Sequence, residues 1–184
     1  MIVAVFGGSF NPPHIAHVLA VTLVLSTHDI HRVVVVPTYK HPFSKALAPY
    51  EERLKMCELA MGWIPRVEVS RVEGELGGES RTLRTIEHLR DTHPDWNLRL
   101  VIGADILVEA AKWHGFDAIQ TIAPPLVLGR AGIHGSSAPR PLLPEISSTE
   151  VRAMIAGGRR DELAPLVPRA VLQHIFERGL YDER

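Results

Sequence analysis

The chain has 184 residues, of which 46% are hydrophobic and 22% charged, with a formal net charge of −1. This composition is typical of a globular protein, and the length favours one domain over residues 1–184. The 20 basic and 21 acidic residues are well mixed, which argues against a nucleic-acid partner. A single cysteine, Cys57, excludes an internal disulfide, and no apolar run is long enough for a signal peptide or a membrane span. We therefore expect a cytoplasmic protein with no membrane partner, and the oligomeric state is left open.

Apolar runs alternate along the chain with segments of helical spacing. The predicted strands, rich in valine, isoleucine and leucine, are residues 2–6, 33–36, 67–69, 98–102 and 126–128. Their near-continuous apolarity is typical of strands covered on both faces, as in a parallel sheet. The predicted helices are residues 15–25, 50–61, 83–89 and 106–111. This alternation predicts an α/β fold with a doubly wound parallel sheet, similar to the Rossmann fold.

The last part of the chain departs from this alternation. Residues 131–144 are rich in glycine, serine and proline and are predicted to form a loop. A helix is expected to begin near Ser147, which has the spacing of a capping box with Glu150, and to end at two glycines, 157–158. A second helix is predicted over residues 167–178. The chain should thus end in a helical segment.

The most informative stretch, residues 7–17, follows the first predicted strand and reads Gly-Gly-Ser-Phe-Asn-Pro-Pro-His-Ile-Ala-His. We expect Gly7 and Gly8 to form a tight turn and to let a ligand approach the backbone closely. Asn11 is expected to cap a helix whose first turn is preset by one of the two prolines after it. A helix would then start at the carboxyl edge of a parallel sheet, where free N–H groups and the helix dipole favour an anion. The stretch predicts a phosphate site.

Two histidines in this stretch, His14 and His17, are three residues apart and fall on one helical face. Imidazole N–H groups can stabilise the charge that accumulates on a phosphate during its transfer. The alternatives are a half-buried helix start without a chemical role, or a zinc pair, for which no third ligand with suitable spacing follows. Neither the Gly-x-x-x-x-Gly-Lys-Ser/Thr loop nor the Gly-x-Gly-x-x-Gly fingerprint occurs, which argues against a kinase or a dehydrogenase.

Two segments resemble the signatures of the nucleotidyltransferase superfamily. Residues 7–17 are similar to its Gly-x-Phe-x-Pro-x-His-x-x-His motif, and residues 146–152 (Ile-Ser-Ser-Thr-Glu-Val-Arg) to its Ile-Ser-Ser-Thr-x-x-Arg motif, which cradles the ATP phosphates. The second motif also has the form of a capped helix start, with Arg152 able to reach one turn back. The ATP-binding residues that the resemblance implies are Gly7, Gly8, Ser9, Phe10, His17, Gly103, Asp105, Arg130, Ile146, Ser147, Ser148, Thr149 and Arg152.

The middle of the chain resembles the bacterial nicotinate-nucleotide adenylyltransferases. Residues 102–105 (Ile-Gly-Ala-Asp), 129–130 (Gly-Arg) and 80–85 (Ser-Arg-Thr-Leu-Arg-Thr) are similar to segments of that family. Two arginines, Arg81 and Arg84, stand where the family usually has Tyr and Asp. On their own, Asp105 would be a helix cap and Trp113 a core residue. The acceptor-binding residues implied by the resemblance are Ser9, Lys45, Thr82, Thr85 and Trp113.

The resemblance implies an adenylyltransferase that transfers AMP from ATP to nicotinate mononucleotide, giving deamido-NAD and pyrophosphate in NAD biosynthesis. The expected partners are thus ATP and a mononucleotide acceptor. The catalytic residues would be His14, His17, Lys45 and Arg152. Mg²⁺ is expected to bind with ATP, and no dedicated metal site on the protein is predicted. Three alternatives remain: nicotinamide mononucleotide as acceptor, phosphopantetheine as acceptor, and a non-catalytic nucleotide sensor on the same fold.

Overall fold

A computed structural model describes residues 1–41, 46–104, 113, 115–129 and 142–182. The strands are β1 (Ile2–Gly8), β2 (Arg32–Pro37), β3 (Val67–Val69), β4 (Asn97–Gly103) and β5 (Pro125–Leu128). The helices are α1 (Ile15–Thr27), α2 (Tyr50–Met61), α3 (Val72–Leu76), α4 (Thr82–Thr92), α6 (Phe116–Ile122), α7 (Ser148–Ala156), α8 (Arg160–Leu163) and α9 (Arg169–Arg178).

The five strands form one parallel sheet in the order β3-β2-β1-β4-β5. Along the chain the sheet grows outward from β1 through β2 to β3, and the chain then returns to the other side of β1 to add β4 and β5. In open α/β sheets, ligands bind outside the carboxyl ends of the strands where the strand order reverses in this way. The fold therefore marks the carboxyl ends of β1 and β4, next to Gly8 and Gly103, as the place for a ligand.

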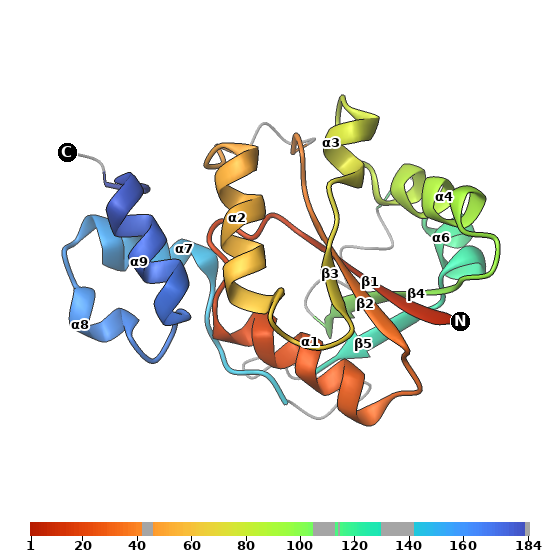
Figure 1. Cartoon of the computed structure of the whole chain (residues 1–184), viewed down its shortest axis with the longest axis horizontal. Coiled ribbons are helices and arrows are strands. Elements are labelled where there is room, and N and C mark those ends of the chain that lie inside the picture. Colours follow the sequence, from red (N-terminus) through yellow and green to blue (C-terminus); the bar gives the residue numbers. More distant parts are fainter. Residues whose placement is uncertain (42–45, 105–112, 114, 130–141, 183–184) are drawn as a thin grey trace.

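Helices cover both faces of the sheet (Figure 1). In β2, Val33 and Val35 belong to a core with α1, α2 and α9, whereas Val34 and Val36 belong to a second core with α4 and α6. Because successive strand residues point to opposite faces, each face of β2 needs apolar side chains. This confirms the doubly wound sheet and explains the unbroken run of valines.

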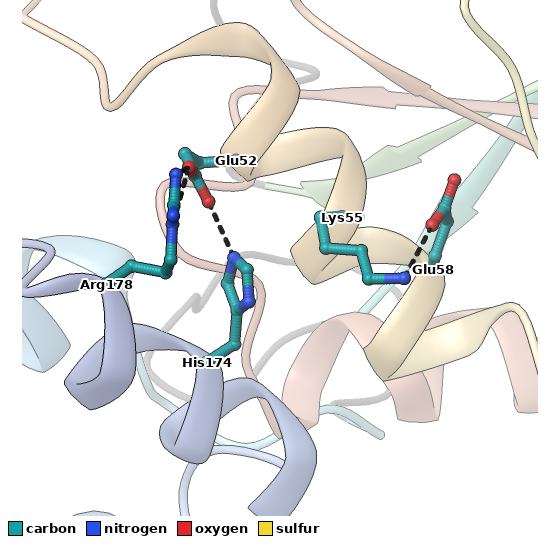
Figure 2. A network of polar contacts seen from close by, with 5 residues as sticks. All are labelled: Glu52, Lys55, Glu58, His174 and Arg178. Atoms are coloured by element: carbon teal, nitrogen blue, oxygen red, sulfur yellow. Dashed lines mark hydrogen bonds and ion pairs between the residues drawn. The ribbon is translucent and has the colours of Figure 1, made fainter.

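The C-terminal helices α7, α8 and α9 lie beside α2, away from β5 (Figure 1). Figure 2 shows a polar contact between α2 and α9, in which the Glu52 carboxylate bonds to His174 Nε2 at 2.7 Å and to Arg178 Nη2 at 2.7 Å. The hydrogen bond from Arg178, followed by that from His174, lowers the pKa of Glu52 below its usual value. This contact fixes α9 against the first turn of α2.

The predicted strands and most of the predicted helices are confirmed, with small shifts at their ends. The last helix begins at Arg169 rather than at residue 167, because Pro168 is its N-cap residue, with a non-helical ψ of 136°. Three short helices, α3, α6 and α8, were not predicted. Their 5, 7 and 4 residues are too few to show a helical period. The predicted helix 106–111 and residues 131–141 of the predicted loop lie outside the described residues. In the described part of the chain, no helix is long and apolar enough to span a membrane.

Candidate functional site

The end of β1 differs from the expected glycine turn. Gly7 and Gly8 are extended and pair with the last residues of β2, Val36 and Pro37. The chain turns instead at Phe10, whose φ of 45° lies in the left-handed region. A Cβ at Gly8 would lie 3.2 Å from the Phe10 ring, so the ring would have to shift by a few tenths of an ångström, whereas no atom of the described residues lies within 4 Å of a Cβ placed on Gly7. The expected tight turn was wrong, but the open space at Gly7 permits close approach to the backbone.

The expected cap at Asn11 was also wrong, because α1 begins at Ile15 with His14 as its extended N-cap residue. Asn11 and Pro12 each precede a proline, and this position disfavours helical conformation. The Asn11 side chain is buried, and its Oδ1 accepts hydrogen bonds from Ala48 N at 3.0 Å and Tyr181 Oη at 2.8 Å. Asn11 therefore holds the loop in place instead of capping the helix.

The two histidines come together at the start of α1. The His14 and His17 ring centroids lie 3.9 Å apart with an interplanar angle of 36°. The backbone N–H of His14 donates to Nδ1 of His17 at 3.1 Å. Because Nδ1 accepts this bond, the neutral His17 ring carries its proton on Nε2, which makes that atom a donor. The Phe10 ring, 4.9 Å away, packs against His17 and orients it further.

The second signature forms the predicted capped helix start. Ser147 is the N-cap residue of α7: its Oγ accepts from Glu150 N at 3.2 Å, and its N–H donates to the Glu150 carboxylate at 2.7 Å. Ile146, next to the cap, is buried in the core with α1 and α2. Geometry leaves the N–H groups of Ser148 and Thr149 outside the helical hydrogen-bond ladder of α7. These two groups are thus the expected anion donors of this helix.

The two signatures lie side by side although they are far apart in sequence. Ser148 Oγ donates to the carbonyl of Pro12 at 2.8 Å across 136 positions. Arg152 Nη1 donates to the carbonyl of Asn11 at 2.7 Å, and Nη2 to Thr149 Oγ1 at 3.3 Å. Arg152 thus reaches one turn back, as predicted, and also bridges to the first signature. The arrangement brings both helix starts to one place.

The start of α1 offers fewer free donors than the sequence suggests. The N–H of Ile15, the first residue of α1, already donates to the carbonyl of Leu166 at 2.8 Å. The segment between α8 and α9 therefore covers one of the groups expected to bind an anion. Of the two histidine side chains at this helix start, His14 is buried and His17 is partly exposed.

The predicted acceptor segment connects the end of β2 to the start of α4. Ser80 Oγ accepts from Tyr39 N at 2.8 Å and from Lys40 N at 3.2 Å. Thr85 is buried, and its hydroxyl donates at 3.0 Å to Glu73, whose other carboxylate oxygen accepts from Tyr39 N. Thr85 thus has a bracing role that the sequence did not indicate, and its contact with an acceptor stays a prediction.

The two arginines of this segment have partners within the protein. Arg84 donates to the carbonyls of Leu76 and Gly77 at 2.7 and 2.6 Å. Arg81 forms an exposed ion pair with Glu79 at 3.1 Å. Arg84 therefore braces residues 76–77 at the end of α3.

Other predicted site residues are placed as follows. Thr82 is the first residue of α4, and Gly103 is the last residue of β4. Trp113 is half-buried and packs against the core with α4, at 6.3 Å from the Phe116 ring. Lys45, Asp105 and Arg130 lie outside the described residues.

Sequence reasoning missed Arg53, which is 1% exposed and donates to the carbonyl of Ser9, next to the first signature. A signal was present in the sequence. Arg53 shares a helical face with Cys57, Ala60 and Met61, which are apolar and buried. A charged residue on an apolar helix face is expected to have specific polar partners.

Comparisons with known proteins agree with this geometry. Residues 5–154 match the sequence model of the family described as cytidylyltransferase-like. The "Probable nicotinate-nucleotide adenylyltransferase" of Anaeromyxobacter sp. (strain K) is 46% identical over 97% of this chain and 96% of its own length. The protein of the same name from Myxococcus xanthus is 38% identical over 97% of this chain and 94% of its own length.

A solved structure agrees in fold. The Plasmodium falciparum nicotinic acid mononucleotide adenylyltransferase complexed with NaAD has a TM-score of 0.85, at 16% identity, over 100% of this chain and 98% of that one. With the strand order and the two joined signatures, these similarities place the chain in the nicotinate-nucleotide adenylyltransferase family, within the cytidylyltransferase-like nucleotidyltransferases.

Proposed function

We propose that this protein transfers the AMP part of ATP to nicotinate mononucleotide, with deamido-NAD and pyrophosphate as products. The observation that carries the proposal is the contact between the two signatures, through Ser148 to Pro12 and Arg152 to Asn11. It gathers donors from two helix starts in one place, as a triphosphate requires. The choice of nicotinate mononucleotide as acceptor is supported by the names of full-length relatives.

In the proposed reaction, an oxygen of the acceptor's phosphate attacks the α-phosphorus of ATP. A new phosphorus–oxygen bond forms there while the bond to the bridging oxygen breaks, and pyrophosphate leaves with the electron pair. The acceptor phosphate is already ionised near neutral pH, so no general base has to remove a proton. Catalysis then depends on positioning the reactants and stabilising the charge.

The described residues suit these tasks. His17 carries its proton on Nε2, and we assign it with His14 to the α-phosphate in the transition state. Arg152 uses two of its five N–H groups within the protein and keeps three for phosphate oxygens. We assign Arg152, Ser148 and Thr149 to the β- and γ-phosphates. Lys45 is proposed as a further phosphate ligand on the family resemblance alone.

We propose that Mg²⁺ enters as part of the substrate MgATP, held by the phosphates. Among the described residues, no group of three His, Cys, Asp or Glu side chains is placed to hold a metal ion. The ion's contribution would be to neutralise charge on the triphosphate. We also propose that the reaction takes place in the cytoplasm, where ATP and the mononucleotide are available.

A comparison of acceptors tests this function. Pyrophosphate release from ATP should be fastest with nicotinate mononucleotide, slower with nicotinamide mononucleotide, and absent with phosphopantetheine. If phosphopantetheine alone were adenylylated, the proposed acceptor would be wrong, whereas the proposed transfer of AMP from ATP would stand. Binding of ATP without pyrophosphate release with any of the three would indicate a nucleotide sensor.

A further inference from the structure

Arg53 in α2 is almost completely buried, and all its hydrogen bonds go to backbone carbonyls. Its Nε donates to Ala48 O at 2.9 Å. Its Nη1 donates to Ser9 O at 3.1 Å and to Thr38 O at 2.6 Å, and Nη2 donates to Tyr39 O at 3.3 Å. One planar guanidinium therefore joins three separate segments of the chain.

These segments meet at the carboxyl edge of the sheet. Ser9 directly follows β1, and Thr38 and Tyr39 directly follow β2. One backbone bond, from Thr38 N to Gly8 O at 2.9 Å, continues the pairing of the two strands at this edge. Beyond it, Arg53 holds the ends of the two strands together. Ser9 precedes the Phe10 turn and the histidine pair, so this clamp holds the residue that leads into them.

Burying the charged guanidinium of Arg53 costs free energy, and a role in packing alone does not account for a charge at this position. Arginine stays protonated in proteins, and burial lowers the pKa of Arg53 without removing the charge. Among the described residues, no carboxylate lies within ion-pair distance of Arg53. Its guanidinium is instead 5.5 Å from the centre of the Tyr50 ring. A buried cation without an anionic partner is unfavourable, and a bound anion near this edge of the sheet would offset that cost.

We propose that Arg53 is a positioning residue for adenylyl transfer, which sets the first signature in place for the nucleotide phosphates through Ser9. The proposal rests on the function proposed above. A lysine at position 53 keeps the charge but cannot join the three segments. Misplacement of a site by about 1 Å is enough to reduce a rate by about 10²-fold.

The test compares Arg53→Lys with Arg66→Lys. Arg66 also donates to two carbonyls, of Ile30 at 3.1 Å and of Leu25 at 3.4 Å, but at the opposite edge of the sheet, where β2 and β3 begin. It is therefore a control for the loss of a carbonyl-binding arginine away from the site, although Arg66 is exposed where Arg53 is buried. Kinetic constants and the melting temperature would be measured for both variants and for Arg53→Gln, which removes the charge.

We expect Arg53→Lys to lower kcat by about 10²-fold at a temperature where the variant is fully folded. Arg66→Lys should lose stability but keep kcat and the KM for ATP. Arg53→Gln should also bind a non-hydrolysable ATP analogue about tenfold more weakly than Arg53→Lys in calorimetry, because it lacks the buried charge.

Two results would overturn the role of Arg53. One is a folded Arg53→Lys protein with the wild-type kcat and KM. The other is failure of both Arg53 variants to fold while Arg66→Lys folds, since Arg53 would then be needed for the whole fold and not for the site. The analogue titration separates this proposal from the proposed function, because it requires no acceptor.

Discussion

At the scale of single residues, the histidine pair connects the sequence most directly to chemistry. Its spacing predicted that His14 and His17 meet, and their rings lie 3.9 Å apart, but they do not share a helical face as expected, because His14 is the N-cap residue before α1. The tautomer of His17 was not predictable, because it depends on the backbone N–H of His14. The same limit applies to Asn11 and Thr85, whose partners come from segments distant in sequence.

Replacing His17 with alanine tests its role in the transition state. The substitution removes a preorganised donor to developing charge, so kcat should fall about 10²- to 10³-fold while ATP still binds. Steady-state kinetics with ATP and nicotinate mononucleotide would measure this. His28→Ala, at the exposed far end of the same helix, is the control and should keep wild-type kinetics. Near-normal turnover by His17→Ala would remove this residue from the mechanism.

At the scale of elements, the sequence predicted best those strands and helices that have a long apolar run or a complete capping box. The five strands were predictable because burial on both faces leaves an unbroken apolar run. The start of α7 was predictable because a capping box involves only Ser147 and Glu150. Helices of one or two turns, such as α8, have no such signal, because packing determines them more than local sequence.

The cap of α7 makes a prediction about stability. Ser147→Ala removes the acceptor for Glu150 N and should lower the free energy of unfolding by about 1 kcal/mol. Urea denaturation would measure the loss. The matched control is Ser26→Ala, because the Ser26 hydroxyl is exposed and bonds only within α1. Equal stability of the two variants would show that the cap does not stabilise α7.

The contact between α2 and α9 makes a prediction about pH. Its hydrogen bonds lower the pKa of Glu52 in the folded protein, chiefly through Arg178. The stabilisation is therefore complete above the ordinary glutamate pKa of 4.5, and is lost as the pH falls through the lower folded value. The stability difference between wild type and Glu52→Gln should be largest near neutral pH and should shrink below about pH 4.5.

The control for this effect lies on the same helix (Figure 2). Glu58 pairs with Lys55 at 3.4 Å, and both side chains are about half exposed. Exposed pairs of this kind contribute little to stability, so Glu58→Gln should differ little from wild type at every pH. A Glu52→Gln difference that stayed constant from pH 7 to pH 3 would contradict the assignment.

At the scale of the whole molecule, the site depends on contacts that the sequence does not reveal. The order of the two signatures along the chain suggested a common site, but the bonds between Ser148 and Pro12 and between Arg152 and Asn11 were not predictable. They join the first turn of α7 to the loop that follows β1. The order of the strands and the packing of helices α7, α8 and α9 against the rest of the protein depend on the whole folded chain, so no local segment of the sequence reveals them.

The loop before His14 is also supported by Tyr181, a residue of the C-terminal segment. Its hydroxyl donates to Asn11 Oδ1 at 2.8 Å, across 170 positions. Tyr181→Phe should cost about 1 kcal/mol of stability and should raise the KM for ATP, because the loop before His14 loses a support. Tyr39→Phe, at a 40% exposed position, is the control. An unchanged KM in Tyr181→Phe would show that the C-terminal segment does not support the site.

In the proposed reaction, the α-phosphorus of ATP passes to the acceptor. Two parallel reactions with nicotinate mononucleotide, one with ATP labelled at the α-phosphorus and one with ATP labelled at the γ-phosphorus, test it most directly. We predict that the α label appears only in a dinucleotide with the mass of deamido-NAD, and the γ label only in pyrophosphate. Appearance of the γ label in the nucleotide product, or of the α label in a released phosphate, would contradict adenylyl transfer by this protein.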